Sequence, residues 1–358
     1  MRVAVGLSGG VDSAVAALLL KQSGQEVLGI TMSIWRDNPC YKAGSGDACF
    51  GPGEKQDIEQ ARGLAEIIGI PYRVLNCAEQ YQKIVLDYFK NEYLTGRTPN
   101  PCVFCNSQVK FGALVELARQ SGLQFDRFAT GHYANIKEVN GRYVLQKARD
   151  AQKDQTYFLY RLRQEQLKQI IFPLGGLLKS EVRDIAKKNN LPVSGKPDSQ
   201  DFYSGDYNDL IAAPDKPGNI VDTSGKVLGA HNGYWHYTVG QRKGLGIAAE
   251  RPLYVLNLDA CKNEVLVGYE EETLCAGLIA DNLNWLIAEK PEQMSAWVKI
   301  RSAQKEFPAE IIPHGADSIE VRFAEPQKAV TKGQSVVVYD GESVAGGGVI
   351  TQPLKENK

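Results

Sequence analysis

The first 200 residues alternate short apolar runs with stretches in which apolar side chains recur at helical spacing. The apolar runs predict strands at Val3–Leu7, Glu26–Met32, Pro71–Asn76 and, running into a loop, Phe128–Tyr133. The helical spacing predicts helices at Asp12–Gln22, Glu54–Ile68, Tyr81–Tyr93 and Lys110–Gln120. Strands that alternate with helices of this length indicate βαβ units. We therefore expect an α/β domain with a doubly wound parallel sheet over residues 1–200.

The pattern changes after residue 200. Residues 201–270 are rich in turns and glycine, as in the run 237–246, and are expected to form a small central domain. Residues 271–358 contain short β-rich runs separated by glycine and proline, at Ala296–Ile300, Ser318–Phe323 and Ser335–Tyr339. Such runs indicate a small antiparallel barrel or sandwich, and we take a C-terminal β-barrel as the prediction.

Length and composition limit the class of protein. A chain of 358 residues with 43% hydrophobic and 23% charged side chains is expected to form two or three globular domains. Its 41 basic and 42 acidic side chains exclude a protein that is basic throughout, but they allow a basic face. No run of about 18 apolar residues is present to span a membrane. The chain starts with a strand-like run instead of a secretory segment, so we expect a cytoplasmic protein.

A glycine-rich octet follows the first predicted strand and consists of Gly6, Leu7, Ser8, Gly9, Gly10, Val11, Asp12 and Ser13. The glycines permit a tight turn, and the helix that follows offers free amides and the positive end of its dipole to a phosphate. The serines add hydroxyl donors, and Asp12 is suited to a Mg²⁺ ion that bridges phosphates. Because the lysine of a Walker P-loop is absent, this is a different nucleotide-binding loop or, alternatively, a glycine-rich turn capped by serine.

The octet resembles the pyrophosphate loop of ATP pyrophosphatases, which adenylate a substrate and release pyrophosphate. Synthetases of GMP, NAD and argininosuccinate share this loop with RNA thiolases. The resemblance implies ATP and Mg²⁺, and the octet alone does not choose among these enzymes.

Two cysteines, Cys102 and Cys105, form a CxxC pair within the run Thr98–Asn106. Pro99 and Pro101 restrict the backbone before the pair, so we expect a stiff loop. The spacing is compatible with a single metal ion or with a redox pair, and the alternative is two buried thiols near the start of a helix. In a reducing compartment, clustered cysteines indicate metal binding or catalysis more often than structural disulfides.

Further motifs resemble the bacterial transfer-RNA 2-thiouridylases over essentially the whole chain. They are the octet, GRTPNP at 96–101 with CN at 105–106, ATGHY at 129–133, KDQTYFLY at 153–160, FPLG at 172–175, YTVGQRKGLG at 237–246, GQS at 333–335 and GGG at 346–348. The family implies ATP-dependent 2-thiolation of the wobble uridine (U34) of tRNA, through adenylation of the C2 oxygen and transfer of sulfur at a cysteine site. It also implies a sulfur donor, which is a persulfide carrier or sulfide.

The resemblance assigns roles to individual residues. In the family a methionine and a glycine border the adenosine, and Met32 and Gly131 match them. The first catalytic cysteine matches Cys105, and Cys102 stands where the family often has aspartate. Positions near the tRNA or its target base are matched by Asn100, Pro101, Cys102, His132, Lys153, Asp154, Gln155, Arg301, Ser302 and Gln334. Residues 201–270 and the β-barrel are expected to hold the anticodon arm.

The sequence departs from the family at one catalytic position. The second family cysteine, which carries the persulfide, lies in a run that matches residues 198–204, and Tyr203 stands in its place. A phenol cannot carry sulfane sulfur, so the usual cycle of two cysteines is in doubt. Three options remain: another cysteine such as Cys102 substitutes, an external sulfide or persulfide acts directly, or a [4Fe-4S] cluster binds the sulfur. Candidate ligands of such a cluster are Cys102, Cys105 and Cys49, with Cys40 as a further candidate for the third position.

Two other functions stay open at this point. One is an ATP pyrophosphatase that thiolates a different RNA position. The other is an RNA-binding paralogue with weakened catalysis, which is suggested by Tyr203 at the position of the family cysteine. ATP–pyrophosphate exchange that depends on tRNA discriminates the enzymes from the binding protein.

Overall fold

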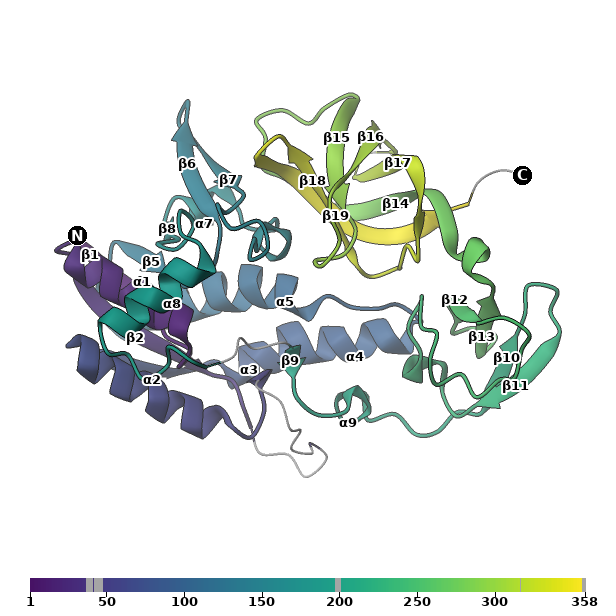
Figure 1. Ribbon diagram of the computed structural model, residues 1–358, viewed down its shortest axis with the longest axis horizontal. Coiled ribbons are helices and arrows are strands. Elements are labelled where there is room, and N and C mark those ends of the chain that lie inside the picture. The colour runs from purple at the N-terminus through teal and green to yellow at the C-terminus, as the bar shows by residue number, and fades with distance from the viewer. Residues whose placement is uncertain (37–40, 42–47, 197–200, 316, 356–358) are drawn as a thin grey trace.

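The computed structural model describes residues 1–36, 41, 48–196, 201–315 and 317–355, which form three successive parts along the chain (Figure 1). The first is a parallel sheet with the strand order β4-β2-β1-β5-β8. Its strands are β1 (Arg2–Gly6), β2 (Glu26–Ser33), β4 (Tyr72–Asn76), β5 (Arg127–Ala129) and β8 (Ile170–Ile171). The predicted α/β domain with a parallel sheet is confirmed.

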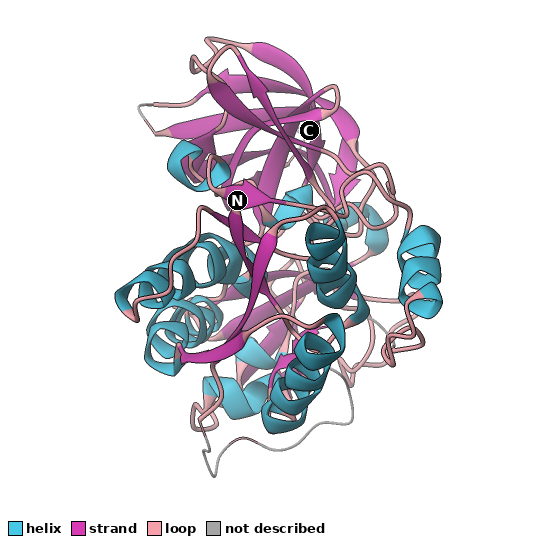
Figure 2. Cartoon of the chain, turned by 90° about the vertical axis from the view of Figure 1, so that its left-hand side faces the viewer, coloured by secondary structure: helices cyan, strands magenta, loops and turns pink. Residues whose placement is uncertain are grey.

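Helices cover both faces of this sheet (Figure 2). Along β1, Val3 and Val5 pack into one core with α1 (Val11–Gln22), α2 (Glu54–Ile68) and α8 (Lys179–Lys188). Ala4 points to the other face and joins a second core. That core contains the helical segments α3 (Ala78–Tyr81), η1 (Gln82–Leu86), α4 (Asp87–Leu94), α5 (Pro101–Phe104), η2 (Cys105–Ala113) and α6 (Leu114–Gln120). The continuous apolar run of β1 is therefore explained by burial on both faces of the sheet.

The CxxC segment is helical, so the prediction of a stiff loop is wrong. Helix α5 begins at Pro101, and the chain stays helical through η2 to the end of α6 at Gln120. Proline is favourable at the first helical position because its fixed φ suits the helix and its missing N–H would have no helical partner there. The segment η2 is a π-helix, an arrangement found frequently at functional sites.

The central part of the chain forms a small sheet with the order β11-β10-β13-β12. Its strands are β10 (Gly218–Val221), β11 (Val227–His231), β12 (Tyr254–Asp259) and β13 (Glu264–Gly268). Two short strands, β3 (Ala48–Phe50) and β9 (Asp201–Tyr203), pair in parallel. Short helical segments connect these parts at η3 (Thr156–Phe158), α7 (Gln164–Leu167), α9 (Tyr207–Ile211), η4 (Tyr234–His236) and η5 (Glu270–Thr273).

The C-terminal part is a closed antiparallel barrel, as predicted. Its strands are β14 (Leu274–Trp285), β15 (Met294–Lys299), β16 (Phe307–Pro313), β17 (Ser318–Lys328), β18 (Ser335–Asp340) and β19 (Ser343–Leu354). Pairing of β14 with β19 closes the barrel, and the hairpin β6 (Asn135–Val139) and β7 (Arg142–Gln146) from the first domain extends its sheet. A side chain at Gly347 would lie 2.5 Å from the Val336 carbonyl oxygen and 2.7 Å from the Tyr160 ring, so this strand needs glycine where it meets the first domain.

Contacts across the domains fix the barrel against the parallel-sheet domain. The Tyr157 hydroxyl donates to the Ser335 carbonyl at 3.0 Å. The Gln334 amide donates to the Thr98 and Pro99 carbonyls at 3.2 and 2.9 Å. In the part of the chain that the structure describes, no helix is long and apolar enough to cross a membrane.

Candidate active site

A cavity of about 820 Å³ opens at the carboxyl end of the parallel sheet and collects most of the predicted site residues. Ligands of open α/β sheets bind in this position. Its lining includes Gly6, Leu7, Ser8, Gly10, Val11, Asp12, Ser13, Met32, Cys49, Asn100, Pro101, Cys102, Cys105, Gly131, His132, Lys153, Gln155, Ser302 and Gln334. The described lining does not include Gly9, Asp154 or Arg301. Because Ser302 and Gln334 come from the barrel, both domains build the cavity.

The start of α1 presents unused backbone donors to this cavity. Gly10 is the N-cap in an extended conformation, and the first helical bond runs from the Ala14 amide to the Gly10 carbonyl at 3.3 Å. The amides of Val11 to Ser13 precede that bond and therefore have no helical acceptor. The Ser13 hydroxyl accepts from the Ser8 amide at 3.1 Å and donates to the Gly10 carbonyl at 3.2 Å, which holds the loop around these amides.

Glycine is required where other segments approach this loop. Gly9 has a φ of +75°, and a side chain there would lie 2.9 Å from the Asp57 carbonyl oxygen. A Cβ on Gly131 would lie 2.6 Å from the carbonyl carbon of Asp12 and 2.7 Å from the Ser13 nitrogen. The ATGHY segment thus packs directly on the start of α1.

Lys179, at the start of α8, supplies a cation that the octet lacks. Its ammonium lies 2.7 Å from both carboxylate oxygens of Asp12, and the Tyr133 hydroxyl donates to the same carboxylate at 2.8 Å. The lysine is 9% exposed and touches the loop through Asp12, although it does not belong to the described lining of the cavity. Sequence reasoning missed Lys179 because it lies 167 residues from Asp12; the available signal was a lysine at a helix start shortly after the FPLG turn.

Asp12 is the octet's one carboxylate and fits the role expected of a Mg²⁺ ligand. Mg²⁺ is usually held by one or two carboxylates together with substrate phosphates, so a cage built wholly of protein is not needed. Among the residues that the structure describes, no group of three or more His, Cys, Asp or Glu side chains is arranged to hold a metal ion. The hypothesis of a cluster on Cys102, Cys105 and Cys49 therefore gains no support, and Cys40 lies outside the described residues.

Cys102 and Cys105 lie at the cavity wall, one on α5 and one at the start of η2. Burial raises the pKa of the Cys105 thiol to about 11, and the Lys110 ammonium opposes that rise. Burial also raises the pKa of the Cys102 thiol. The charge of Cys49, and then that of Cys105, adds to this rise. Lys110 lines the same cavity, and no carboxylate of the described residues pairs with it. A cation thus faces the two thiols.

His132 is a neutral member of the cavity wall. It is 8% exposed, and its Nδ1 lies 2.7 Å from the Thr130 hydroxyl. Burial and, next, the charge of Lys110 hold the pKa of the imidazole well below its usual range. His132 is therefore suited to a hydrogen bond or a ring contact and not to pairing with a phosphate as a cation.

Two predicted tRNA-contacting residues make internal contacts. The Asp154 carboxylate accepts from the Ala148 and Thr156 amides at 2.8 and 3.3 Å, and burial raises its pKa. The Arg301 guanidinium donates to the carbonyls of Val239 and Ala329 and to the Thr331 hydroxyl, at 3.1, 3.0 and 2.8 Å. Asp154 thus orders the turn before η3, and Arg301 ties the central domain to the barrel.

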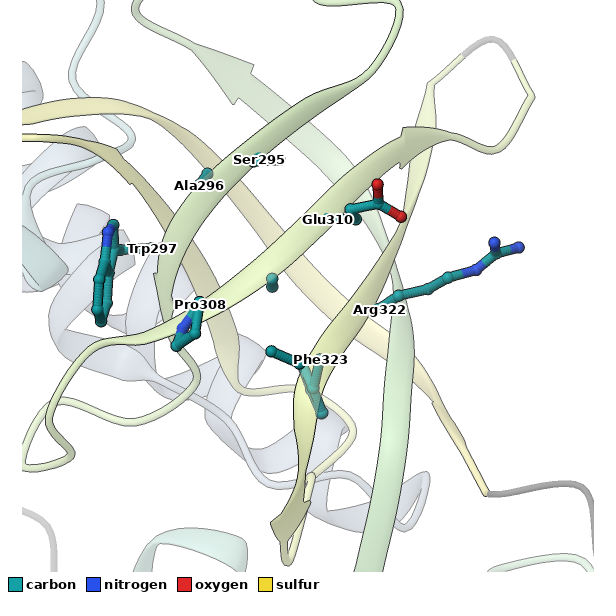
Figure 3. A pocket seen from close by; sticks show the side chains of 9 residues that line it. Ser295, Ala296, Trp297, Pro308, Glu310, Arg322 and Phe323 are labelled. Carbon is teal, nitrogen blue, oxygen red and sulfur yellow. The ribbon is translucent and has the colours of Figure 1, made fainter.

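Another hollow, of about 410 Å³, lies on the outside of the barrel over β15, β16 and β17 (Figure 3). Trp297 and Pro308 face each other at one end, and Glu310 and Arg322 form the other end. Its described lining contains none of the predicted site residues, so we place the site in the larger cavity.

The chain matches three domain families in succession. They are described as the tRNA methyl transferase HUP domain over residues 1–203, the tRNA methyl transferase PRC-barrel domain over residues 211–269 and the aminomethyltransferase beta-barrel domain over residues 275–350.

Full-length relatives carry a more specific description. The chain is 52% identical over 357 residues to the tRNA-specific 2-thiouridylase MnmA of Endomicrobium trichonymphae, covering 98% of this chain and 99% of the relative. It is 45% identical over 364 residues to the tRNA-specific 2-thiouridylase MnmA 2 of Thermoanaerobacter sp. strain X514, covering 99% of each. Among solved structures, a 4-thiouridine synthetase–RNA complex with bound ATP superposes with a TM-score of 0.35 at 19% identity, over 60% of this chain and 46% of that one.

Proposed function

The chain belongs to the tRNA-specific 2-thiouridylase family, and we propose that it uses ATP to replace the C2 oxygen of the wobble uridine of tRNA by sulfur. The observation that carries this proposal is one cavity that joins a pyrophosphate loop to a pair of cysteines. A methyl transferase, which the domain descriptions name, would have no use for a loop that binds ATP phosphates. The loop and the thiols together suit adenylation followed by sulfur transfer.

The first step needs a better leaving group than a carbonyl oxygen. Attack of the uracil O2 on the α-phosphorus of ATP joins AMP to that oxygen and releases pyrophosphate. The amides of Val11 to Ser13 and the ammonium of Lys179 are suited to the negative charge of the phosphates. Asp12 would hold Mg²⁺, which when bound neutralises phosphate charge. Met32 and Gly131 line the same cavity, as expected of residues that border the adenosine.

The second step needs a sulfur nucleophile at C2, with AMP as the leaving group. Cys102 and Cys105 are the thiols that we place at this step, beside the Lys110 cation. Asn100 and Pro101, next to them in the cavity, are placed at the target base. The base has to leave the anticodon stack to enter, which costs least for an unpaired loop base.

The partner is a tRNA, which is held by residues of both the first domain and the barrel. Lys153 and Gln155 from the first domain and Ser302 and Gln334 from the barrel are the contacts we assign to it. Residues 201–270 and the barrel would then hold the anticodon arm. A chain with a net charge of −1 needs such a local arrangement, because its overall field does not attract RNA.

A deletion strain tests this function in the cell. We expect loss of wobble 2-thiouridine, measured by mass spectrometry of total tRNA, and its return when the wild-type gene is supplied. Cys105→Ala is expected not to restore it, whereas Cys261→Ala, at an exposed cysteine, restores it fully. Restoration by Cys105→Ala would contradict the role of that thiol. Unchanged 2-thiouridine in the deletion strain would contradict the function, and absence of tRNA-dependent adenylation would favour an RNA-binding protein.

A further inference from the structure

The pairing of β3 with β9 brings Cys49 next to the strand that holds Tyr203. The register joins Ala48 to Asp201 and Phe50 to Tyr203, so Cys49 lies level with Phe202. Side chains alternate between the faces of a strand. The rings of Phe50 and Tyr203 share one face, with centroids 6.0 Å apart. Cys49 and Phe202 share the other face, and both line the cavity.

The Tyr203 side chain points into the protein interior and does not reach the cavity. It is 2% exposed, its hydroxyl donates to the Asp209 carboxylate at 3.3 Å, and it does not belong to the described lining. The family cysteine is thus replaced by a buried aromatic side chain, while a thiol from the neighbouring strand faces the site.

Among the described residues, three cysteines line the cavity, and Cys49 is the accessible one. It is exposed, whereas Cys102 and Cys105 are partly buried at the wall. The three thiols lie within electrostatic reach of one another, since the charge of Cys49 raises the pKa of both other thiols. A sulfur donor approaching from outside therefore meets Cys49 before it meets the CxxC pair.

We propose that Cys49 is the thiol that accepts sulfane sulfur from an external persulfide and carries it to the adenylated base, and that the CxxC pair of Cys102 and Cys105 resolves the product. The inference rests on the proposed function and adds to it the residue that substitutes for the missing cysteine. The sulfur donor to this thiol is a persulfide of the form R–S–SH, in which R is a small thiol compound or a donor protein.

The chemistry balances in three steps. The Cys49 thiolate attacks the terminal sulfur of R–S–SH, which gives Cys49–S–SH and releases R–S⁻ without net oxidation. The terminal sulfur of that persulfide attacks C2 of the adenylated uracil, and AMP leaves. A CxxC thiolate then attacks the Cys49 sulfur, so the sulfane sulfur leaves with the electron pair as 2-thiouridine and a disulfide remains. A dithiol reductant returns both cysteines to thiols.

Two sulfur sources test the proposal with the full-length protein, ATP and unmodified tRNA. One reaction receives ³⁵S-labelled glutathione persulfide and the other receives inorganic sulfide, which attacks C2 directly and needs no carrier thiol. For Cys49→Ser we expect at least about a tenfold slower formation of 2-thiouridine with the persulfide. With sulfide we expect the wild-type rate, and this reaction also shows that the variant is folded. The matched control is Cys261→Ser, another exposed cysteine, which should behave as wild type with both sources.

The outcomes separate this inference from the proposed function. Wild-type activity of Cys49→Ser with persulfide would overturn the carrier role, and so would equal loss with both sources. If the wild-type protein forms no 2-thiouridine with either source, the proposed function itself fails. After one turnover without reductant, we expect a disulfide between Cys49 and Cys102 or Cys105 in an amount equal to the 2-thiouridine formed. Thiolation without such a disulfide would overturn the resolving step.

Discussion

At the scale of single residues, two lysines set the local charge, one behind the phosphate loop and one beside the thiols. Lys179 holds Asp12 and faces the phosphate loop, and Lys110 faces the two thiols of the CxxC pair. The octet and the cysteines could be read from the sequence because each is a local motif. The two lysines could not be predicted, because each interacts with residues that only the fold brings close. Lys179, for example, lies 167 residues from Asp12 in the sequence.

Lys179→Met tests the phosphate end of the site. The change leaves the Asp12 carboxylate without its ion pair and removes the cation that we propose to act on the ATP phosphates. We expect tRNA-dependent ATP–pyrophosphate exchange to fall by about 100-fold or more, as for loss of a group that stabilises developing charge. Lys187→Met, at an exposed lysine of the same helix, should exchange at the wild-type rate. Equal rates for both variants would remove Lys179 from the site.

Lys110→Met tests the electrostatic coupling to the thiols. Burial raises the pKa of the Cys105 thiol to about 11, and Lys110 lowers it. Because the thiol is neutral below its pKa, the thiolate fraction and the alkylation rate should grow about tenfold for each pH unit up to that pKa. Loss of the lysine should move this profile to higher pH, whereas Lys110→Arg, which keeps the charge, should leave it near that of wild type. The profile is measured by iodoacetamide labelling of Cys105 followed by mass spectrometry, and identical profiles for both variants would contradict the coupling.

At the scale of elements, the sequence predicted the regular parts well and the site segment poorly. The helix at Glu54–Ile68 has the predicted ends because its apolar spacing and its following glycine are local signals. The segment from Pro101 was predicted as a loop because its two prolines restrict the backbone, but here Pro101 occupies the first helical turn. Cys261 is exposed because it lies in the polar turn that follows β12.

Gly131→Ala tests the contact between ATGHY and the start of α1. The new methyl group would lie 2.6 Å from the Asp12 backbone, so the loop or the helix end has to shift. We expect a loss of about 1–3 kcal/mol in the free energy of unfolding, together with weaker ATP binding. Gly63→Ala in α2 meets nothing within 4 Å and should instead raise stability by about 0.5–1 kcal/mol. Urea unfolding measures both variants, and a Gly131→Ala protein as stable as wild type would contradict the close packing.

At the scale of the whole molecule, the cavity exists because the barrel closes one side of it. Gln334 contacts the chain just before the CxxC helix, and Arg301 connects the central domain to the barrel. Separate β-rich runs predicted the barrel, but the sequence pattern could not show which barrel residues would reach the first domain. Arg301 donates to three internal acceptors that join the central domain to the barrel, and its contact with RNA stays a prediction.

We propose that adenylation and sulfur transfer occur in this one cavity, at the same base. The measurement that tests it most directly follows the purified protein with unmodified tRNA, ATP and sulfide, and quantifies AMP and wobble 2-thiouridine in the same sample. We expect one AMP for each 2-thiouridine, with both products lost when ATP is omitted. Formation of 2-thiouridine without ATP, or release of AMP without any 2-thiouridine, would contradict the account.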